Sequence, residues 1–390
     1  MVLPMTTPRC DYFEAGRCRS CALIETPIAE QLAAKDARCR ALLPDVPAAA
    51  WLPIVSGGER DFRNKAKLVV GGSTGAVTLG ILGPGGTGVD LRDCLIQEPA
   101  IRAAIPRLAA FLDGTGLPPY DVPARRGELK YALVTAAPSG ELMLRFVVRS
   151  EHALAVLRRG LPELRAVVPE ASVISVNLLP EHVALLEGER EEPLLGSSLT
   201  MDLGSDAGSV ALHLRPQSFF QTNTLVAREL YAQAAEWVAR VDPASIWDLY
   251  CGVGGFALAC APRDAGASAR RVLGVELSAE AVRSAERSAR DAGISAHFVA
   301  QDATAFALGS APGDVPELVI VNPPRRGIGA ELAAWLEGCG VDRVIYSSCN
   351  PESLARDLAA MPGFVVREAR VFDMFPHTTH LEVMVLLERA

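Results

Sequence analysis

The sequence predicts an α/β protein in two parts: a domain with a largely parallel sheet over residues 206–390, preceded by an α+β domain with an antiparallel sheet over residues 1–205. Three observations lead to this prediction. Strand-like and helix-like segments alternate through the C-terminal part, as in βαβ units. Short β-like runs broken by Gly and Pro clusters fill residues 51–150, which is typical of antiparallel strands. The turn-rich string GSDAGS at 204–209 separates the two parts.

Length and composition limit the class of protein. The 390 residues, 49% of them hydrophobic, are enough for two or three domains with ordinary cores. The N-terminal string MVLPMTTPRC lacks a signal pattern, and we find no apolar run of about 18 residues, so we expect a cytoplasmic protein with no membrane partner. The net charge of −8 disfavours general binding of polyanions, which depends on Lys and Arg, but a local basic face is compatible with it. The sequence indicates no obligate protein partner.

A glycine-rich loop organises the C-terminal domain. The string DLYCGVGGFA runs from Asp248 to Ala257, between a strand-like SIW and a helix-like ALACA. Gly252 and Gly254 allow the backbone to approach a cofactor, and we expect unpaired N–H groups there. Glu276 ends the strand-like RVLGVEL, about 20 residues beyond the glycines, where an acid can accept hydrogen bonds from ribose hydroxyls. The loop also fits the pattern G-x-G-x-x-G/A, so an NAD or flavin site remains as well supported as a nucleoside site.

Successive strands are predicted at SIWDLY, RVLGVEL, SAHFVA, ELVIVN and RVIYSSC. The clearest helix, SAEAVRSAERSARDAG, is opened by Ser278 and closed by Gly293. Ligands of such sheets bind beyond the carboxyl ends of the strands, so the residues at those ends should share one rim. These residues are Tyr250, Glu276, Asp302, Asn322 and Cys349. Asp302 has a simpler explanation as the cap of a helix.

The nine cysteines are unevenly spaced, which in a reducing compartment favours metal or catalytic use over disulfides. Cys10, Cys18 and Cys21 form C-x7-C-x2-C, and Cys94 lies alone in LRDCLIQEP. Four thiolates from two stretches can form a tetrahedral site for zinc or for an iron–sulfur cluster. The alternative is a set of unrelated buried thiols, which the arginines on both sides of Cys18 disfavour. Cys39 lies at helical spacing with leucines in IAEQLAAKDARCRALL and is expected to pack in a core.

Basic residues in the N-terminal part interleave with aromatic and amide side chains. Positive charges neutralise phosphates and aromatic rings stack on unpaired bases, so this composition suits RNA. A solvated strand face explains the same charges equally well. The residues are Arg60, Phe62, Arg63, Asn64, Lys65, Lys67, Arg125, Arg126, Lys130, Tyr131, Arg145 and Arg149.

Two motifs at predicted strand ends decide between chemistries: VNPPRRG at 321–327 and YSSCN at 346–350. An N-P-P at a strand end is typical of methyltransferases that act on the amino group of adenine, in which an aromatic residue follows the prolines. Here Arg325 follows them. Cys349 supplies a nucleophile, which neither amino-group methylation nor a dehydrogenase requires.

Long strings across nearly the whole chain carry a resemblance to one family. They are AGRCRSC, FRNKAKLVV, RRGELKY, LRPQSFFQTN, DLYCGVGGF, ELVIVNPPRRGIG, IYSSCN and VFDMFPHTTHLEV. In these strings the chain resembles the bacterial S-adenosylmethionine-dependent RNA (uracil-C5)-methyltransferases. The resemblance implies a Rossmann-like class I methyltransferase domain and an N-terminal RNA-recognition domain that carries an iron–sulfur cluster. It also implies methylation of one specific uridine in 23S ribosomal RNA, as free or partly assembled RNA.

The resemblance further assigns roles to residues. It places a [4Fe–4S] cluster on Cys10, Cys18, Cys21 and Cys94. It places S-adenosylmethionine at Gln221, Tyr250, Glu276 and Asn322, next to the glycines of the loop. Cys349 would be the nucleophile and Glu382 the general base. Relatives often have Asp in place of Asn322 and Phe in place of Tyr250. Longer relatives begin with a small β-barrel that has no counterpart here, so RNA contacts are expected from residues 1–205 and from the rim.

The chemistry explains why these residue types are needed. Uracil C5 is a poor nucleophile until a group adds at C6, and a Cys349 thiolate adding there makes an enolate that can attack a sulfonium methyl. The C5 proton must leave before the thiol is eliminated, which requires a carboxylate such as Glu382. Without the resemblance, Glu382 would be interpreted as a surface charge on an edge strand. His377 and His380 are candidate site-lining residues with no assigned role.

Other functions remain as alternatives. One is methylation of another ribosomal uridine or of tRNA, and another is a non-catalytic RNA-binding protein that only retains the cofactor site. A third is an NAD-dependent enzyme. Consumption of S-adenosylmethionine on unmodified ribosomal RNA would separate the first two, and nicotinamide binding would reveal the third.

Overall fold

The computed structural model describes residues 7–204, 210–262 and 270–390, which form two compact units. The N-terminal unit consists of Pro8–Ile24 and Gly58–Met201, and the C-terminal unit contains Glu25–Gly57 and Asp202–Ala390. The predicted boundary at 205/206 lies outside the described residues. The two units divide just before it, between Met201 and Asp202. The prediction assigned all of residues 1–205 to one domain, whereas Glu25–Gly57 packs with the C-terminal unit.

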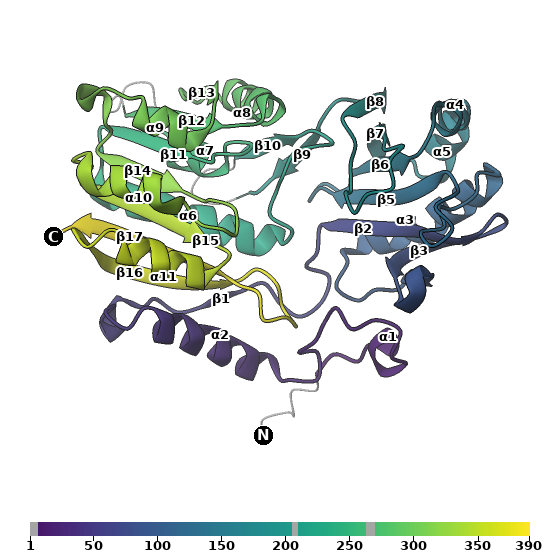
Figure 1. Cartoon of the computed structure of the whole chain (residues 1–390), viewed down its shortest axis with the longest axis horizontal. Helices are drawn as coiled ribbons and strands as arrows, with labels where there is room; N and C mark the ends of the chain where they lie inside the picture. The colour runs from purple at the N-terminus through teal and green to yellow at the C-terminus, as the bar shows by residue number, and fades with distance from the viewer. Residues whose placement is uncertain (1–6, 205–209, 263–269) are drawn as a thin grey trace. The chain divides into compact units, whose positions relative to one another are not determined.

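The C-terminal unit is built on an eight-stranded sheet in the order β1-β16-β17-β15-β14-β11-β12-β13 (Figure 1). β17 runs antiparallel to β15 and β16, and the other neighbours are parallel. The central strands β11 and β14 are buried along their whole length, as their continuous apolar runs predict. The strands are β1 (Val55–Ser56), β11 (Ser245–Leu249), β12 (Arg271–Glu276), β13 (His297–Ala300), β14 (Leu318–Val321), β15 (Arg343–Ser348), β16 (Phe364–Asp373) and β17 (Glu382–Arg389). The predicted largely parallel sheet and its five named strands are confirmed.

Helices of this unit share cores with the sheet. Residues of α2, α9, α10 and α11 lie in one apolar cluster with the strands, and Cys39 of α2 is fully buried there, which confirms its predicted packing role. The predicted helix caps are also present, because the Ser278 hydroxyl accepts from the Ala281 N–H at the start of α8 and Gly293 adopts a φ of +65° after its end. The helices are α2 (Ile28–Leu42), α6 (Thr224–Val241), α7 (Gly255–Cys260), α8 (Ala279–Asp291), α9 (Ala303–Leu308), α10 (Gly329–Gly338) and α11 (Pro351–Ala359), with short 3-10 turns at Ala48–Ala50 and Pro312–Asp314 and a strand β10 at Ala211–Leu214.

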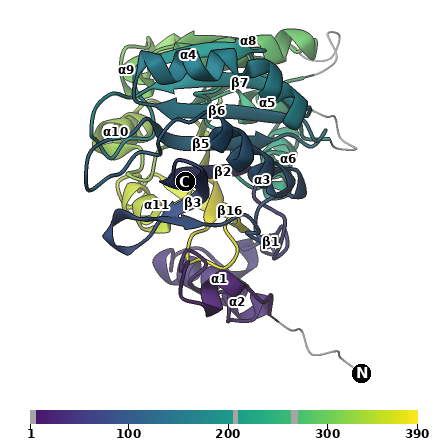
Figure 2. The same cartoon turned by 90° about the vertical axis from the view of Figure 1, so that its right-hand side faces the viewer.

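The N-terminal unit contains a seven-stranded sheet in the order β4-β3-β2-β5-β6-β7-β8. Its neighbours are antiparallel except β6 and β7, which are parallel because α4 and α5 connect them. The predicted antiparallel sheet is therefore correct apart from this pair. Helices α3, α4 and α5 cover one face and share its core (Figure 2). The elements are α1 (Asp11–Glu14), β2 (Lys65–Ser73), β3 (Ala76–Leu82), β4 (Gly88–Asp90), α3 (Pro99–Gly114), β5 (Leu129–Ala136), β6 (Leu142–Val148), α4 (Glu151–Arg159), α5 (Leu161–Val167), β7 (Ala171–Leu178), β8 (Arg190–Leu195) and β9 (Leu199–Asp202), with a 3-10 turn at Pro84–Gly86.

Candidate active site

The glycine loop joins β11 to α7 at the carboxyl end of the sheet. Gly252 and Gly254 adopt φ values of +54° and +86°, which only glycine adopts without strain, and a side chain at Gly254 would also press on Ala285 and Phe298. Around Gly252 the space for a side chain is open. The loop therefore presents bare backbone on the side of Gly252, which suits the close approach of a cofactor.

Glu276 ends β12 and binds the same loop. One of its carboxylate oxygens accepts from the Gly252 N–H at 3.1 Å and the other from the Ser278 N–H at 2.9 Å. The Gly254 N–H is likewise paired, with the Cys251 carbonyl. The expectation of unpaired N–H groups at these glycines is thus wrong, because the neighbouring strand and the turn itself satisfy them. Each carboxylate oxygen has a second lone pair, so Glu276 can still accept from ribose hydroxyls.

Asp248 binds the first turn of helix α7, directly after the loop. It is fully buried, one oxygen accepts from the Ala257 N–H at 2.8 Å, and the other has no hydrogen-bond partner among the described residues. The pKa of this carboxyl is raised to about 8, mainly by burial and in part by the nearby Glu276, although the hydrogen bond from the Ala257 N–H lowers it. A protonated Asp248 at neutral pH removes the need to bury a charge beneath the loop.

Other predicted rim residues lie where their strand ends place them. Tyr250 follows β11 with a φ of +68°, and its hydroxyl lies 3.5 Å from the Thr304 hydroxyl. Asn322 follows β14 and is half-buried. Asp302 caps α9 by accepting from the Ala305 N–H at 2.9 Å, which confirms the simpler explanation for it. Gln221 is buried in the segment between β10 and α6.

Cys349 and Glu382 are brought together by strand register. β15 and β17 are antiparallel, and their pairing ends with Ser348 opposite Val383. Cys349 follows β15 directly and Glu382 is the first residue of β17, so the two residues lie opposite each other at the end of the ladder. The Glu382 carboxylate also affects the pKa of the Cys349 thiol, as expected for close neighbours. No spacing along the sequence, in which 32 residues separate them, could show this.

Burial sets the protonation of Glu382. The side chain is 2% exposed, and burial raises the pKa of the carboxyl to about 7, although a hydrogen bond from the Ser347 hydroxyl at 2.6 Å lowers it. Glu382 is therefore no surface charge. A carboxylate with a pKa near neutrality is well matched to take a proton from carbon and to release it afterwards.

Arg325 is a site residue to which sequence reasoning gave no role. Burial and the Glu382 carboxylate raise the pKa of the Cys349 thiol, whereas the charge of Arg325 and a hydrogen bond from its side chain lower it. The guanidinium thus stabilises the thiolate form. The feature of the sequence that could have indicated this role is the N-P-P motif, in which Arg325 stands where amino-group methyltransferases have an aromatic residue.

The loop that carries Arg325 is held by the helix after Cys349. The Arg325 carbonyl accepts from the Asn350 side chain at 2.9 Å, and the Ile328 N–H donates to Asp357 of α11 at 2.9 Å. Gly327 adopts a φ of +84°, and a side chain there would collide with the Asp357 carboxylate. The two motifs chosen from the sequence, VNPPRRG and YSSCN, therefore form one hydrogen-bonded structure.

The two histidines have different surroundings. His377 is fully buried with a φ of +63°, and its N–H and ring are bonded to Gln31 of α2, so it is not available as a site-lining residue. His380 is exposed, and burial together with the charges of Arg325, Lys35 and Arg38 lowers its pKa. His380 is thus the histidine that lies near Arg325.

The four predicted cluster cysteines are all in the N-terminal unit. The pKa of the Cys21 thiol is raised to about 12, mainly by burial and in part by Cys94, Cys18 and Cys10, which shows that the four cysteines are neighbours. All four thiols are free, and Cys10 and Cys21 pack on a small apolar cluster. In the part of the chain that the structure describes, no group of three or more His, Cys, Asp or Glu side chains is arranged so that it could hold a metal ion. The donor chemistry fits an iron–sulfur cluster, while the arrangement is not that of a formed metal site.

Several predicted RNA-binding residues are buried and paired inside the N-terminal unit. Arg145 is 4% exposed and binds Glu187 at 2.5 Å and Glu191 at 2.6 Å. Lys130 is buried, and its ammonium donates to the Glu181 carbonyl at 2.5 Å. The expectation that Arg145 and Lys130 neutralise RNA phosphates is wrong, because acceptors of the same unit bind both side chains. The exposed members of the predicted set are Arg60, Lys67, Arg125, Arg126 and Arg149.

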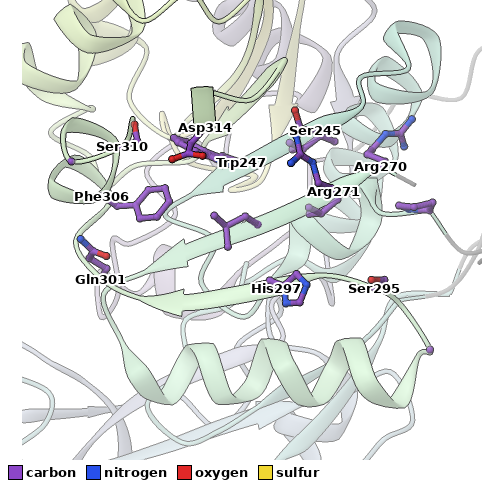
Figure 3. A pocket seen from close by; sticks show the side chains of 16 residues that line it. Ser245, Trp247, Arg270, Arg271, Ser295, His297, Gln301, Phe306, Ser310 and Asp314 are labelled. Carbon is purple, nitrogen blue, oxygen red and sulfur yellow. The ribbon is translucent and has the colours of Figure 1, made fainter. Parts of the chain in front are cut away.

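A cavity of about 930 Å³ lies elsewhere in the C-terminal unit (Figure 3). Its lining includes the first three residues of β11 and of β12, with Trp247 and Phe306 among the aromatic side chains. None of the predicted site residues lines it. Because ligands of parallel sheets bind at the carboxyl ends of the strands, we assign the chemistry to the rim with Cys349 and not to this cavity.

Comparison with known families and proteins adds a second line of evidence. Residues 315–390 match the family described as tRNA (Uracil-5-)-methyltransferase, and residues 246–322 match the family described as Methyltransferase domain. A curated protein of Shigella sonnei, named 23S rRNA (uracil(747)-C(5))-methyltransferase, is 47% identical over 381 residues, which are 97% of this chain and 99% of that protein. A protein of the same name from Halothiobacillus neapolitanus is 48% identical over 385 residues, again 97% of this chain and 99% of that protein.

One solved structure has the same fold over nearly the whole chain. The crystal structure of Pyrococcus abyssi tRNA (uracil-54, C5)-methyltransferase in complex with S-adenosyl-L-homocysteine has a TM-score of 0.78 and 24% sequence identity, and the match covers 98% of this chain and 86% of that one. Strand order and family matches together make the C-terminal unit an S-adenosylmethionine-dependent methyltransferase domain. The identity to full-length relatives goes further. The chain belongs to the RNA (uracil-C5)-methyltransferase family, with the 23S rRNA (uracil(747)-C(5))-methyltransferases as its relatives at 47% and 48% identity.

Proposed function

We propose that this protein methylates C5 of one uridine in 23S ribosomal RNA, with S-adenosylmethionine as the methyl donor and a covalent cysteine–uracil adduct on the path. The observation that supports this most directly is the meeting of Cys349 and Glu382 at the end of the β15–β17 ladder, with Arg325 on the thiol. A nucleophile and a base next to each other are what C5 methylation of uracil needs and what a dehydrogenase or a plain RNA-binding protein does not need.

In the proposed reaction each residue has one task. The Cys349 thiolate forms a bond to C6, and the electron pair of the C5=C6 bond moves toward the O4 carbonyl. C5 would then take the methyl group of bound S-adenosylmethionine, whose methyl–sulfur bond breaks to leave S-adenosylhomocysteine. Glu382 then removes the C5 proton, and the electrons of that C–H bond re-form C5=C6 while the C6–S bond breaks. The thiolate of Cys349 is thereby restored, and Arg325 stabilises its charge at both ends of the cycle.

The cofactor site is proposed at the glycine loop. Gly252 and Gly254 supply a close backbone approach, Glu276 has free lone pairs for ribose hydroxyls, and Tyr250 provides an aromatic wall. Asn322 ends the neighbouring strand β14 and can hydrogen-bond in both senses, and we keep Gln221 in the set on the family resemblance. Calorimetry of S-adenosylhomocysteine binding to Glu276→Ala tests this part. The affinity for S-adenosylhomocysteine should fall, while the affinity for RNA stays the same.

We also propose that Cys10, Cys18, Cys21 and Cys94 hold a [4Fe–4S] cluster and that the N-terminal unit recognises RNA. The mutual influence of the four free thiols supports the first part. Protein purified without oxygen should be brown and contain iron and sulfide, and Cys18→Ser should bleach it. Stoichiometric zinc without sulfide in protein isolated this way would contradict the cluster.

The substrate and the cellular setting complete the proposal. Free or partly assembled 23S ribosomal RNA is the proposed partner, and the cytoplasm the proposed location, because that RNA is made there. In the described residues, no helix is long and apolar enough to cross a bilayer.

The deciding experiment is to incubate purified protein with methyl-labelled S-adenosylmethionine and unmodified 23S ribosomal RNA and to map the label. We expect one 5-methyluridine with the wild type and none with Cys349→Ala, although both bind RNA. If tRNA is labelled in a parallel reaction and 23S ribosomal RNA is not, the substrate is tRNA. RNA binding without any methyl transfer would favour the non-catalytic alternative.

A further inference from the structure

Side chains on one face of helix α2 hydrogen-bond to the segment that precedes Glu382. Gln31, Lys35 and Arg38 are spaced by four and three residues, which places their side chains on the same side of the helix. Gln31 and Lys35 are 1% and 4% exposed, which is unusual for such side chains unless they are fully bonded. Each of the three binds a residue at the opposite end of the sequence, in residues 373–379.

The contacts of Gln31 fix a strained residue. Its amide oxygen accepts from the His377 N–H at 2.8 Å, its amide nitrogen lies 3.3 Å from the His377 ring nitrogen Nδ1, and the same nitrogen donates to the Thr26 carbonyl at 2.7 Å. His377 has a φ of +63°, which a residue with a side chain adopts only when its surroundings hold it. Gln31 therefore determines the path of the backbone five residues before Glu382.

Lys35 and Arg38 bind residues before and after His377. The Lys35 ammonium donates to Asp373, the last residue of β16, at 2.5 Å and to the Phe375 carbonyl at 3.1 Å. Arg38 donates to the Thr379 carbonyl at 3.1 Å and to Glu352 of α11 at 2.6 Å. Glu352 lies three residues after Cys349.

Helix α2 thus binds the segment that leads into Glu382 and also the helix α11 that follows Cys349. The strand ladder sets the two residues opposite each other, but Glu382 is the first residue of β17, where the ladder ends. Its position depends on the chain that enters from residues 374–381, and that chain is bonded to α2 at three points.

We propose that Gln31, Lys35 and Arg38 are positioning residues for the proton-abstraction step: they hold residues 373–379 so that the Glu382 carboxylate faces C5 of the cysteine adduct. This rests on the proposed function. Gln31 and Lys35 hydrogen-bond to the segment that precedes Glu382, so their loss affects removal of the C5 proton more than attack by Cys349.

The test uses Gln31→Met, which keeps the length of the side chain and removes its hydrogen bonds. We expect normal binding of S-adenosylhomocysteine and RNA, a fall in kcat of about 10- to 100-fold with KM unchanged, and a methylated covalent protein–RNA adduct that survives denaturing electrophoresis. The matched control is Gln233→Met, because Gln233 is an equally buried glutamine of α6 that binds Arg370 of β16. It should accumulate no adduct.

A second variant covers a failure of Gln31→Met to fold. Arg38 is 40% exposed, so Arg38→Gln leaves the core intact and should accumulate adduct to a smaller extent. If a folded Gln31→Met or Arg38→Gln shows the wild-type ratio of adduct to product, α2 has no positioning role. Equal accumulation in Gln233→Met would also overturn it, since the effect would then be general loosening. A wild type that forms no 5-methyluridine contradicts the proposed function itself, which separates the two failures.

Discussion

Cys349 and Glu382 act at different points of the proposed reaction, so removing each should stop it at a different point. Cys349→Ala should bind both substrates and form neither adduct nor product, because no other group adds to C6. Glu382→Gln should still attack and methylate, then remain as a covalent adduct, because an amide cannot take the C5 proton. Denaturing electrophoresis with labelled RNA measures this. Normal turnover of Glu382→Gln would show that another residue is the base.

The pKa of Glu382 predicts how adduct release depends on pH. Burial raises this pKa to about 7, and only the ionised form can accept a proton. Release should therefore rise with pH, with a midpoint near pH 7, and level off about one pH unit above it. Ser347→Ala removes a hydrogen bond that lowers the pKa, so the midpoint should move to higher pH in single-turnover rates. A midpoint that stays in place would mean that another group titrates.

The same burial makes Glu382 unfavourable for stability above neutral pH. Its folded pKa of about 7 lies above the ordinary 4.5, so the unfolded chain ionises first and wild-type stability falls as pH rises from 4.5 toward 7. Glu382→Gln avoids this loss. The variant should be more stable than the wild type at pH 8, by at most about 3 kcal/mol, and the difference should shrink below pH 5 in urea unfolding. A pH-independent difference would point to packing instead of ionisation.

At the scale of elements, the loop between β14 and α10 depends on Gly327. Its φ of +84° and the adjacent Asp357 carboxylate leave no room for a side chain. Gly327→Ala should displace the Arg325 loop and reduce methyl transfer at least about 10-fold. Gly340→Ala is the control, because Gly340 has a similar φ of +87° and open space around it. Equal losses in both variants would attribute the effect to backbone strain alone.

The exposed basic residues of the N-terminal unit are the candidates for RNA contacts. Lys67→Ala and Arg126→Ala should each weaken RNA binding and reduce the slope of log K against log salt by about one, while cofactor affinity stays the same. Arg159→Ala, an exposed arginine of α4 outside the predicted set, is the control. An equal loss in the control would mean that the protein's overall charge and not a defined face binds RNA.

At the scale of the whole molecule, the C-terminal unit is discontinuous in sequence. Cys39, Leu43 and Trp51 belong to the same apolar core as strands of the C-terminal sheet. A fragment of residues 206–390 should therefore aggregate, whereas the same fragment co-expressed with residues 25–57 should be recovered folded and bind S-adenosylhomocysteine. A fragment 206–390 that folds alone with full cofactor affinity would contradict this.

Local patterns in the sequence predicted most elements. The continuous apolar runs of β11 and β14, the capped helix α8 and the alternating strands β2 and β3 all follow from side-chain periodicity and turn residues within a few positions of one another. The parallel β6–β7 pair and the packing of α2 against the C-terminal sheet were missed, because both depend on which surfaces meet after the chain has folded back.

For the site, the sequence determined the residue types: a thiol after β15, glycines and an acid around β11 and β12, and a carboxylate near the C-terminus. These are chemical identities and are visible before folding. Only the tertiary structure decided what surrounds them. The antiparallel pairing of β17 with β15 buries Glu382 beside Cys349 and raises its pKa, the turn after Pro324 brings Arg325 to the thiol, and α2 bonds the segment before Glu382. Burial and proximity between residues far apart in the chain have no local signature, because they arise from the register of strands and from packing.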